Sequence, residues 1–199
     1  MEYATFGSAL HRRRCEYLAE LRSVQRALVL GDGDGRFTAE LLRQNPSVFV
    51  DSLELSESMS RVAATRIASC PNGPSRIRQV CEDARTAHLA GSYDLVTSHF
   101  FLDCFTTDEL QALVPRITAH LNTGGRWLIS EFEIPPAGLR RHLATLLVKA
   151  LYVSFRILTG LRTNRLPDYR SVLKSNGYVL TASNAGMAGM LVSEIWQHA

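Results

Sequence analysis

A glycine-rich turn is the first part of the chain that could do chemistry. The stretch RALVLGDGDGRFTAELL, residues 26–42, places Gly31, Gly33 and Gly35 between a short apolar run and a helix-like pattern. Such a turn between a strand and a helix brings backbone N–H groups close to a bound nucleotide-like group. The pattern therefore predicts a nucleotide-type ligand at this turn.

The spacing of the glycines limits which ligand this is. A dinucleotide site needs G-x-G-x-x-G, and here Arg36 stands where the third glycine belongs. The G-K-[ST] signature of a phosphate-binding loop is absent as well. Asp32 and Asp34 place carboxylates in the turn, and these suit a ligand with a positive amino group better than one with phosphates.

Three further residues lie at or after the ends of the second and third expected strands. Glu54 lies 23 positions after Gly31, where an α/β nucleotide site holds a carboxylate for the ribose hydroxyls. Asp83 could accept a hydrogen bond from an adenine amino group, and Met59 could cover the ring with a polarisable surface. Each alone is more often a solvated carboxylate or a core methionine. Together they predict an adenosine site at the carboxyl edge of a sheet.

These residues need a sheet of parallel strands to bring them together. Apolar runs alternate with helical periodicity along most of the chain, which is typical of a doubly wound α/β fold. The expected strands are 27–30, 48–55, 76–81, 93–100 and 126–134, and the expected helices are 8–25, 36–44, 61–68 after an N-cap at Ser56, 108–121 and 168–175.

The C-terminal part of the chain follows a different pattern. Two expected strands, 177–185 and 190–197, are separated by too few residues for a crossover helix, so they must form an antiparallel hairpin. We therefore expect a seven-stranded sheet, mostly parallel, closed by this hairpin, with helices on both faces. The whole chain, 1–199, is expected to be one domain with an N-terminal helix (1–25) and a helical lid insert (134–167).

Five segments carry a resemblance to the class I S-adenosylmethionine-dependent methyltransferases, which have a Rossmann-like fold. VLGDGDG resembles their glycine-rich first motif, and VDSLELSESM their second-strand segment. CEDA resembles the acid after the third strand, YDLVTSHFFLDCF the fourth-strand segment, and LNTGGRWLISEF the fifth. The resemblance covers roughly residues 24–197 and implies S-adenosylmethionine as cofactor and S-adenosylhomocysteine as product.

The resemblance also implies which residues bind the cofactor. By their positions in the motifs, these are Gly31, Asp32, Gly33 and Gly35 at the methionine and ribose portions, Glu54 at the ribose, Leu55 and Met59 at the adenine face, Asp83 and Ala84 at the adenine edge, and Ser98 and His99 at the end of the fourth strand.

Catalysis of methyl transfer depends mainly on alignment and exclusion of water, with a base only where the acceptor loses a proton. His99 is the first candidate base and Asp103 the second. The alternatives are a packing role for His99 and a capping role for Asp103. Phe100 and Phe101 could face the sulfonium or the acceptor. Many relatives carry His-His or His-Leu where this chain has Asp103-Cys104, so the family assigns no base here.

The insert offers a cover for the site. His142, Lys149 and Arg156 recur every seven residues as one polar stripe on an otherwise apolar helix, too charged to span a membrane. It could simply pack as a lid, form an apolar acceptor pocket that includes Tyr152, or lie on a membrane surface. Its position and composition resemble an insert in the ubiquinone/menaquinone-biosynthesis methyltransferases.

Composition sets the remaining expectations. The chain has 199 residues, 46% hydrophobic and 21% charged, and its formal net charge of +3 is too small to indicate a nucleic-acid partner. Four cysteines occur without C-x-x-C spacing, so we expect neither disulfides nor a metal site. No signal peptide is recognisable, and the expected compartment is the cytoplasm.

The sequence therefore favours a methyltransferase acting on a small apolar or aromatic acceptor. A catalytically inactive accessory or regulatory protein that binds S-adenosylmethionine is the alternative, and a nicotinamide-dependent reductase is disfavoured by Arg36. The acceptor, the methylated atom and the oligomeric state stay open.

Overall fold

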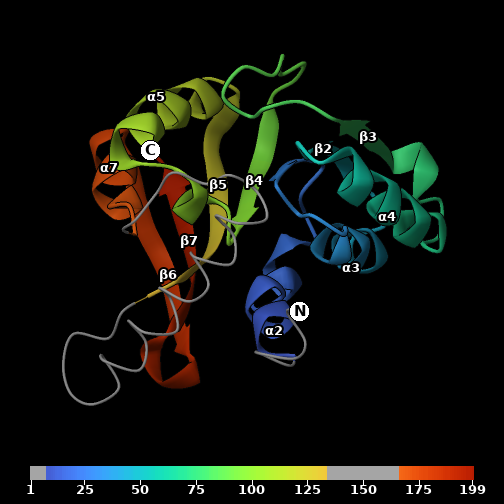
Figure 1. Ribbon diagram of the computed structural model, residues 1–199, viewed down its shortest axis with the longest axis horizontal. Coiled ribbons are helices and arrows are strands. Elements are labelled where there is room, and N and C mark those ends of the chain that lie inside the picture. Colours follow the sequence, from blue (N-terminus) through green and yellow to red (C-terminus); the bar gives the residue numbers. More distant parts are fainter. Residues whose placement is uncertain (1–7, 134–165) are drawn as a thin grey trace.

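A computed structural model of the chain describes residues 8–133 and 166–199. Its centre is a seven-stranded sheet with the order β3-β2-β1-β4-β5-β7-β6 (Figure 1). The strands are β1 (Arg26–Leu30), β2 (Phe49–Leu53), β3 (Ile77–Val80), β4 (Tyr93–His99), β5 (Leu121–Phe132), β6 (Tyr178–Gly186) and β7 (Leu191–His198).

The predicted mixture of parallel and antiparallel pairing is confirmed. Strands β1 to β5 pair in parallel, whereas β7 runs antiparallel to both β5 and β6. The short link between β6 and β7 leaves no room for a crossover, which forces the hairpin. The carboxyl ends of the five parallel strands therefore meet at one edge, and this edge carries the residues considered below.

The helices lie on both faces of the sheet, as predicted. Helices α5 and α7 cover one face, and α3 and α4 lie at the other (Figure 1). Their bounds, with those of the short 3-10 helices, are α2 (Ala9–Arg14), η1 (Leu18–Leu21), α3 (Arg36–Gln44), α4 (Glu57–Ala68), η2 (Pro74–Arg76), η3 (Leu102–Cys104), α5 (Thr107–Thr118), α7 (Tyr169–Ser175) and η4 (Met187–Gly189).

Side-chain caps define where three helices start. Ser56 accepts from the backbone N–H of Met59 at the start of α4, and Asp168 caps α7 through Ser171. Thr106 and Glu109 form a reciprocal capping box at the start of α5. Each cap satisfies helix N–H groups that would otherwise lack partners, and the cap at Ser56 was predicted from the sequence.

Two hydrophobic cores lie on opposite faces of the sheet because successive strand residues alternate in direction. Ala27 and Val29 of β1 point to the core under α3 and α4, whereas Leu28 and Leu30 point to the core under α5 and α7. The strand is thus buried on both sides. This burial explains why its sequence reads as a continuous apolar run.

Two segments differ most from those predicted. The expected helix 8–25 is wrong as a single helix, because α2 ends at Arg14 and the chain continues into the separate turn η1. The fifth strand starts at Leu121, so the segment NTGG belongs to the strand and does not end a helix that reaches 121. Gly124, at φ +71°, permits this unusual strand backbone.

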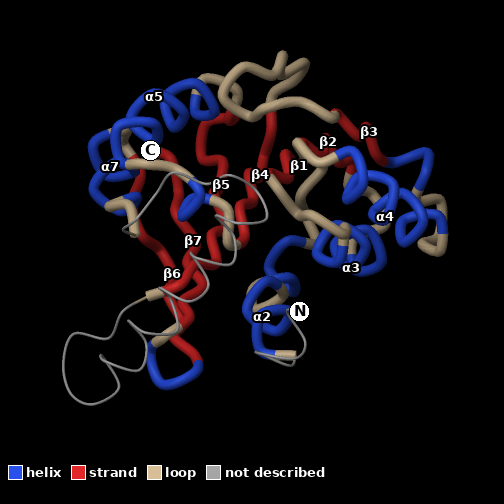
Figure 2. The backbone as a smooth tube through the Cα atoms, in the orientation of Figure 1, coloured by secondary structure: helices blue, strands red, loops and turns tan. Residues whose placement is uncertain are grey.

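The remaining connections matter for the site. Residues 81–92 between β3 and β4 form a long loop without a helix (Figure 2). Of the expected insert 134–167, residues 134–165 fall outside the described part, and with them the polar stripe and Tyr152.

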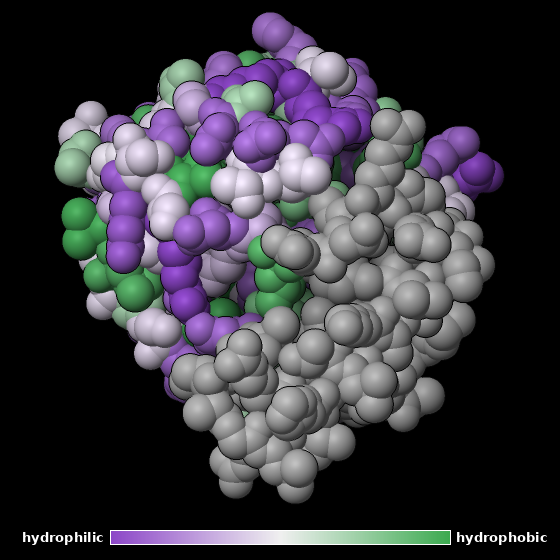
Figure 3. Space-filling model, turned by 60° about the vertical axis from the view of Figure 1, so that its left-hand side comes forward, coloured by the Kyte–Doolittle hydropathy of each residue, from purple (hydrophilic) through white to green (hydrophobic). Residues whose placement is uncertain are grey.

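Two further observations concern the lengths of the helices and the surface of the molecule. Within residues 8–133 and 166–199 no helix is long and apolar enough to cross a membrane. On the face shown in Figure 3, apolar side chains lie scattered among hydrophilic ones around a hollow.

Helix α5 offers a test of this architecture. We expect Leu113→Ala to lower the free energy of unfolding by about 2–5 kcal/mol, because the Leu113 side chain is buried in the core under α5 and α7. Urea denaturation measures the change. Gln111→Ala, on the exposed face of the same helix, is the control and should stay within about 0.5 kcal/mol of the parent chain. Equal effects would show that α5 does not pack as described.

Candidate cofactor and acceptor site

The glycine turn lies at the carboxyl end of β1 and has a left-handed backbone at each of its three glycines. Gly31, Gly33 and Gly35 have φ of +62°, +61° and +75°. A Cβ on Gly31 would stand 2.3 Å from the ring of Phe101, and one on Gly35 would stand 2.7 Å from Ala63. A Cβ on Gly33 would meet no atom within 4 Å, so this α-carbon faces open space. The open position is where a ligand can approach the backbone closely.

The two aspartates of the turn have internal partners. Asp32 is buried and accepts from the backbone N–H groups of Phe37 (3.3 Å) and Thr38 (2.8 Å), at the start of α3. Burial raises the pKa of Asp32. The Asp34 carboxylate binds Arg36 and Arg66 at 2.7 and 3.0 Å. Both aspartates shape the turn, and a direct contact of Asp32 with the cofactor stays a prediction.

Glu54 is held in one orientation at the end of β2. Its Oε2 accepts from Gly33 N at 3.0 Å, and its Oε1 accepts from Ser56 N at 2.9 Å. A carboxylate oxygen has two acceptor positions, so each oxygen keeps one for a further donor. Glu54 is thus preorganised to accept from two neighbouring hydroxyls, as a ribose would present them.

An exposed apolar surface lies beside Glu54. Leu55 and Met59 are 67% and 45% exposed, which is unusual for large apolar side chains in a well-packed domain. Both come from the segment that connects β2 to α4 and from the first turn of that helix. Such a surface can cover the face of a flat ring.

Asp83 follows β3 and is bound by a neighbouring arginine. Arg85 contacts the Asp83 carboxylate at 2.6 Å and also reaches Glu109 at 3.1 Å. The hydrogen bond from Arg85 holds the pKa of Asp83 below its usual value. The next residue, Ala84, is buried. A ligand that uses the Asp83 carboxylate would share it with Arg85.

The side chains at the end of β4 point into the protein. Ser98 is fully buried and accepts from Trp127 Nε1 at 2.9 Å. His99 is 3% exposed, lies 3.0 Å from Ser130 Oγ through Nδ1, and packs its ring 4.3 Å from that of Phe37. Its Nε2 has no hydrogen-bond partner among the described residues.

The burial of His99 bears on its predicted role as a base. Burial, helped by the positive charge of Arg14, lowers the pKa of His99 well below 6.5. The imidazole is therefore neutral at physiological pH and packs in the protein interior, on the same face of the sheet as α3. Its placement favours the packing alternative, while its part in catalysis stays a prediction without structural support.

The two phenylalanines after β4 lie at the edge of the sheet. Phe100 has φ +54°, and its ring packs 4.9 Å from Phe132 and 5.4 Å from the guanidinium of Arg14. Phe101 packs against Gly31 and, edge to face, against Phe105 at 5.0 Å. Phe101 therefore connects the glycine turn to the loop that carries Asp103.

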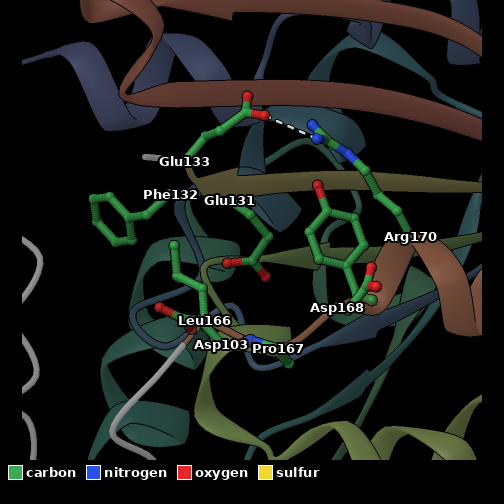
Figure 4. Close-up of a pocket in the computed structure, with 9 residues that line it drawn as sticks. Asp103, Glu131, Phe132, Glu133, Leu166, Pro167, Asp168 and Arg170 are labelled. Carbon is green, nitrogen blue, oxygen red and sulfur yellow. Dashed lines mark hydrogen bonds and ion pairs between the residues drawn. The ribbon is translucent and has the colours of Figure 1, made fainter. Parts of the chain in front are cut away.

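A cavity of about 140 Å³ lies next to this loop. It is lined by Asp103 of η3, by residues 131–133 at the end of β5 and by residues 166–170 at the start of α7 (Figure 4). Glu131 is 1% exposed, and its Oε1 accepts from the backbone N–H groups of Phe101 (3.1 Å) and Leu102 (2.8 Å). Figure 4 shows its carboxyl turned toward Asp103.

The wall opposite Asp103 is built by ion pairs of α7. Arg170 binds Glu133 at 2.8 Å and Glu194 at 2.6 Å, and Tyr169 donates to Glu194 at 3.0 Å. Glu194 is buried on β7, so these contacts attach α7 to the antiparallel part of the sheet. The cavity is therefore bordered by both the parallel and the antiparallel strands.

Burial changes the acidity of the two inner carboxyls. It raises the pKa of Asp103 to about 6. Burial and the neighbouring charge of Asp103 raise the pKa of Glu131 well above the usual range of a glutamate. Perturbed carboxyls in a cavity are typical of functional sites.

Sequence reasoning missed three of these residues. Glu131 and Arg170 line the cavity, and Arg85 holds Asp83. The sequence did contain a signal for Glu131. An acidic residue at the carboxyl end of an apolar strand is rarely buried unless it has a hydrogen-bond or charge partner. No group of three metal-ligating side chains occurs in the parts of the chain that the structure describes.

Comparison with known proteins identifies the family. Residues 27–125 match a family model described as a methyltransferase domain. The malonyl-[acyl-carrier protein] O-methyltransferase of Bacillus cereus is 29% identical over 117 residues, which are 59% of this chain and 40% of that protein. The chain therefore contains a methyltransferase domain, in agreement with its resemblance to the class I S-adenosylmethionine-dependent methyltransferases. It spans well under half the length of the curated relatives it matches.

Solved structures of methyltransferases share the fold. The mitomycin 7-O-methyltransferase MmcR superposes with a TM-score of 0.72 at 16% identity, over 97% of this chain and 55% of that one. The N-methyltransferase NodS from Bradyrhizobium japonicum WM9, in complex with S-adenosylhomocysteine, superposes with a TM-score of 0.68 at 13% identity, over 95% and 87%.

The cofactor of this superfamily is S-adenosylmethionine, and the residues of the site fit it. The open α-carbon of Gly33 leaves room for the cofactor against the backbone. The spare acceptor positions of Glu54 suit the two ribose hydroxyls, and the exposed side chains of Leu55 and Met59 suit the adenine face. The residues predicted to bind adenosine thus lie at one edge of the sheet, and their contacts with the cofactor stay a prediction.

The role of Glu54 can be tested by binding. We expect Glu54→Ala to weaken S-adenosylmethionine binding at least about 30-fold, because charge-assisted hydrogen bonds contribute about 1.5–3 kcal/mol each. Isothermal titration calorimetry measures the affinity. Glu57→Ala removes a carboxylate that is 75% exposed three residues away, and should leave the affinity unchanged. Equal affinities of both variants would place the ribose elsewhere.

The burial of His99 makes a prediction about stability and pH. The unfolded chain takes up a proton on this imidazole near pH 6.5, whereas the folded chain does so only at lower pH. Unfolding is therefore favoured as pH falls below 6.5, by up to about 1.4 kcal/mol per pH unit. In urea denaturation between pH 7.5 and 5, His99→Asn should lose less stability than the parent chain. Parallel pH curves would show that His99 titrates normally in the folded state.

Proposed function

We propose that this chain transfers the methyl group of S-adenosylmethionine to a small apolar or aromatic acceptor, with S-adenosylhomocysteine as product. The observation that carries the proposal is the continuity of two sites across Phe101. Its ring touches Gly31 of the cofactor turn, and two residues later Asp103 lines the cavity of about 140 Å³. Binding the two reactants side by side supplies much of the rate of a displacement reaction.

The residues at the first site hold the cofactor, which supplies a methyl group activated on a positively charged sulfur. The backbone of Gly33 leaves room for the cofactor, Glu54 orients its ribose, and Leu55 and Met59 cover its adenine. Asp83, together with the backbone of Ala84, meets the adenine edge. The motif positions support these roles, and so does the geometry of Gly33, Glu54, Leu55 and Met59.

The second site receives the acceptor. Phe132 and Leu166 give the cavity apolar surface, and its volume is close to that of an engineered cavity of about 150 Å³ that binds benzene. Asp103 is the base we propose for acceptors that lose a proton, since its pKa of about 6 leaves it ionised at neutral pH. The predicted contribution of Tyr152 concerns a residue outside the described part.

Other parts of the proposal rest on the sequence. We propose no nucleic-acid partner because the chain has a small net charge, and a cytoplasmic location because its four cysteines lack the spacing of a disulfide framework. The oligomeric state is left open, as is peripheral contact with a membrane.

Calorimetry and a transfer assay test the proposed function together. We expect S-adenosylmethionine to bind with micromolar affinity and NADH not to bind, because the turn lacks the third glycine of a dinucleotide site. Mass spectrometry then searches for a methylated product in a panel of phenols, amines and carboxylates. Cofactor binding without any product would favour the accessory-protein alternative, and NADH binding alone would contradict the whole assignment.

A further inference from the structure

Two carboxyls at the inner end of the cavity are not used by the cofactor site. Asp103 comes from the loop after β4, and Glu131 lies one strand away, at the end of β5. Asp103 keeps part of its surface exposed, whereas Glu131 is almost completely buried. Two carboxyls that line one small cavity repel each other when both are charged.

The hydrogen bonds of Glu131 show which of its oxygens can hold a proton. Oε1 already accepts two backbone N–H groups, from Phe101 and Leu102. Oε2 is buried and has no hydrogen-bond partner among the described residues, and Glu131 is one of the residues that line the cavity. A buried acceptor without a donor is costly, whereas a protonated Oε2 becomes a donor that a ligand in the cavity can satisfy.

The other titratable groups around the cavity are engaged elsewhere. Arg170 is bound to Glu133 and Glu194, and the hydroxyl of Tyr169 donates to Glu194. Burial raises the pKa of the Cys104 thiol far above neutrality, so it stays uncharged. The Asp168 carboxylate caps α7. Among the described residues that line the cavity, Asp103 and Glu131 are the two carboxyls whose pKa values burial raises.

We propose that Asp103 and Glu131 form a carboxyl pair that holds one proton and selects an acceptor whose nucleophilic atom itself carries a proton, a hydroxyl or an amine. This inference rests on the proposed methyl transfer and specifies its acceptor. Glu131 donates from Oε2 to the acceptor atom and orients it, while Asp103 accepts the proton that the acceptor loses. A carboxylate acceptor has no proton to give and would be repelled by Asp103.

The chemical balance of the step is complete with these groups. The acceptor oxygen or nitrogen forms a bond to the methyl carbon as the carbon–sulfur bond breaks, and both electrons of that bond stay on sulfur. The proton of the acceptor passes to the Asp103 carboxylate and then to solvent. Glu131 keeps its proton throughout.

The position of the pair suits this step. The glycine turn follows β1, and β4 alone separates β1 from β5 in the sheet. Two strand spacings are about 10 Å, a distance that a cofactor and a small acceptor can fill together. Phe101 lies between the two sites, in contact with Gly31 and bound through its N–H to Glu131.

The protonation of Glu131 can be measured without any acceptor. Infrared difference spectra at pH 7 between the parent chain and Glu131→Gln should show the carbonyl band of one protonated carboxyl that the variant lacks. Glutamine keeps the Oε1 acceptor for Phe101 and Leu102, so the fold is preserved. Loss of an ionised-carboxylate band instead would show that Glu131 is charged and would overturn the proposal.

The pH dependence of transfer tests the roles of the two carboxyls. With the phenol or amine that proves to be methylated, kcat/KM should rise through about pH 6 as Asp103 ionises and fall at alkaline pH as Glu131 loses its proton. Asp103→Asn should lower kcat about 100-fold or more. In Glu131→Gln, kcat/KM should still rise near pH 6 but should no longer fall at alkaline pH. If Glu131 had only a structural role, the substitution would leave the alkaline fall unchanged.

Controls separate this proposal from the proposed function. Asp108→Asn removes an exposed carboxylate from the same connection and should behave as the parent chain. Asp103→Asn and Glu131→Gln should both bind S-adenosylmethionine as the parent chain does. Methylation of carboxylates alone, or full activity of Asp103→Asn, would contradict the pair while leaving methyl transfer intact. Failure of the parent chain to bind the cofactor would instead contradict the proposed function.

Discussion

The contact between the Phe101 ring and the bare α-carbon of Gly31 is the constraint on which the site depends. Any side chain at position 31 would overlap the ring, since even a Cβ would stand 2.3 Å from it. This close approach fixes the loop after β4 against the turn after β1. The loop in turn carries Asp103 and donates two N–H groups to Glu131. The glycine turn and the cavity beside Asp103 are therefore parts of one packed unit.

Two carboxyl groups of this region, those of Glu54 and Glu131, lie in different environments. Glu54 is partly exposed, accepts two backbone N–H groups and keeps acceptor positions open at the surface. Glu131 also accepts two backbone N–H groups, but through a single oxygen and in the interior. Burial raises the pKa of Glu131, together with the neighbouring charge of Asp103. The first suits the binding of hydroxyls and the second the holding of a proton.

Much of the fold could be predicted because its signals are local. The apolar run of β1, the caps Ser56 and Thr106, and the short link before β7 each act within a few residues. The helix expected over 8–25 was wrong because the helical periodicity of the sequence continues past Arg14. The chain there leaves α2 and forms the separate 3-10 helix η1. Packing against distant elements overrides local propensity in such segments.

The sequence by itself determined the sheet, the glycine turn and the carboxylate Glu54, since motif spacing along parallel strands places them at one edge. Only the tertiary structure decided the direction of each side chain at that edge. His99 and Asp103 stand four residues apart, yet His99 turns into the core beside Phe37 and Asp103 lines the cavity. The partnership of Asp103 with Glu131 joins residues that are 28 positions apart. Such a pairing depends on strand order and packing, which no local pattern encodes.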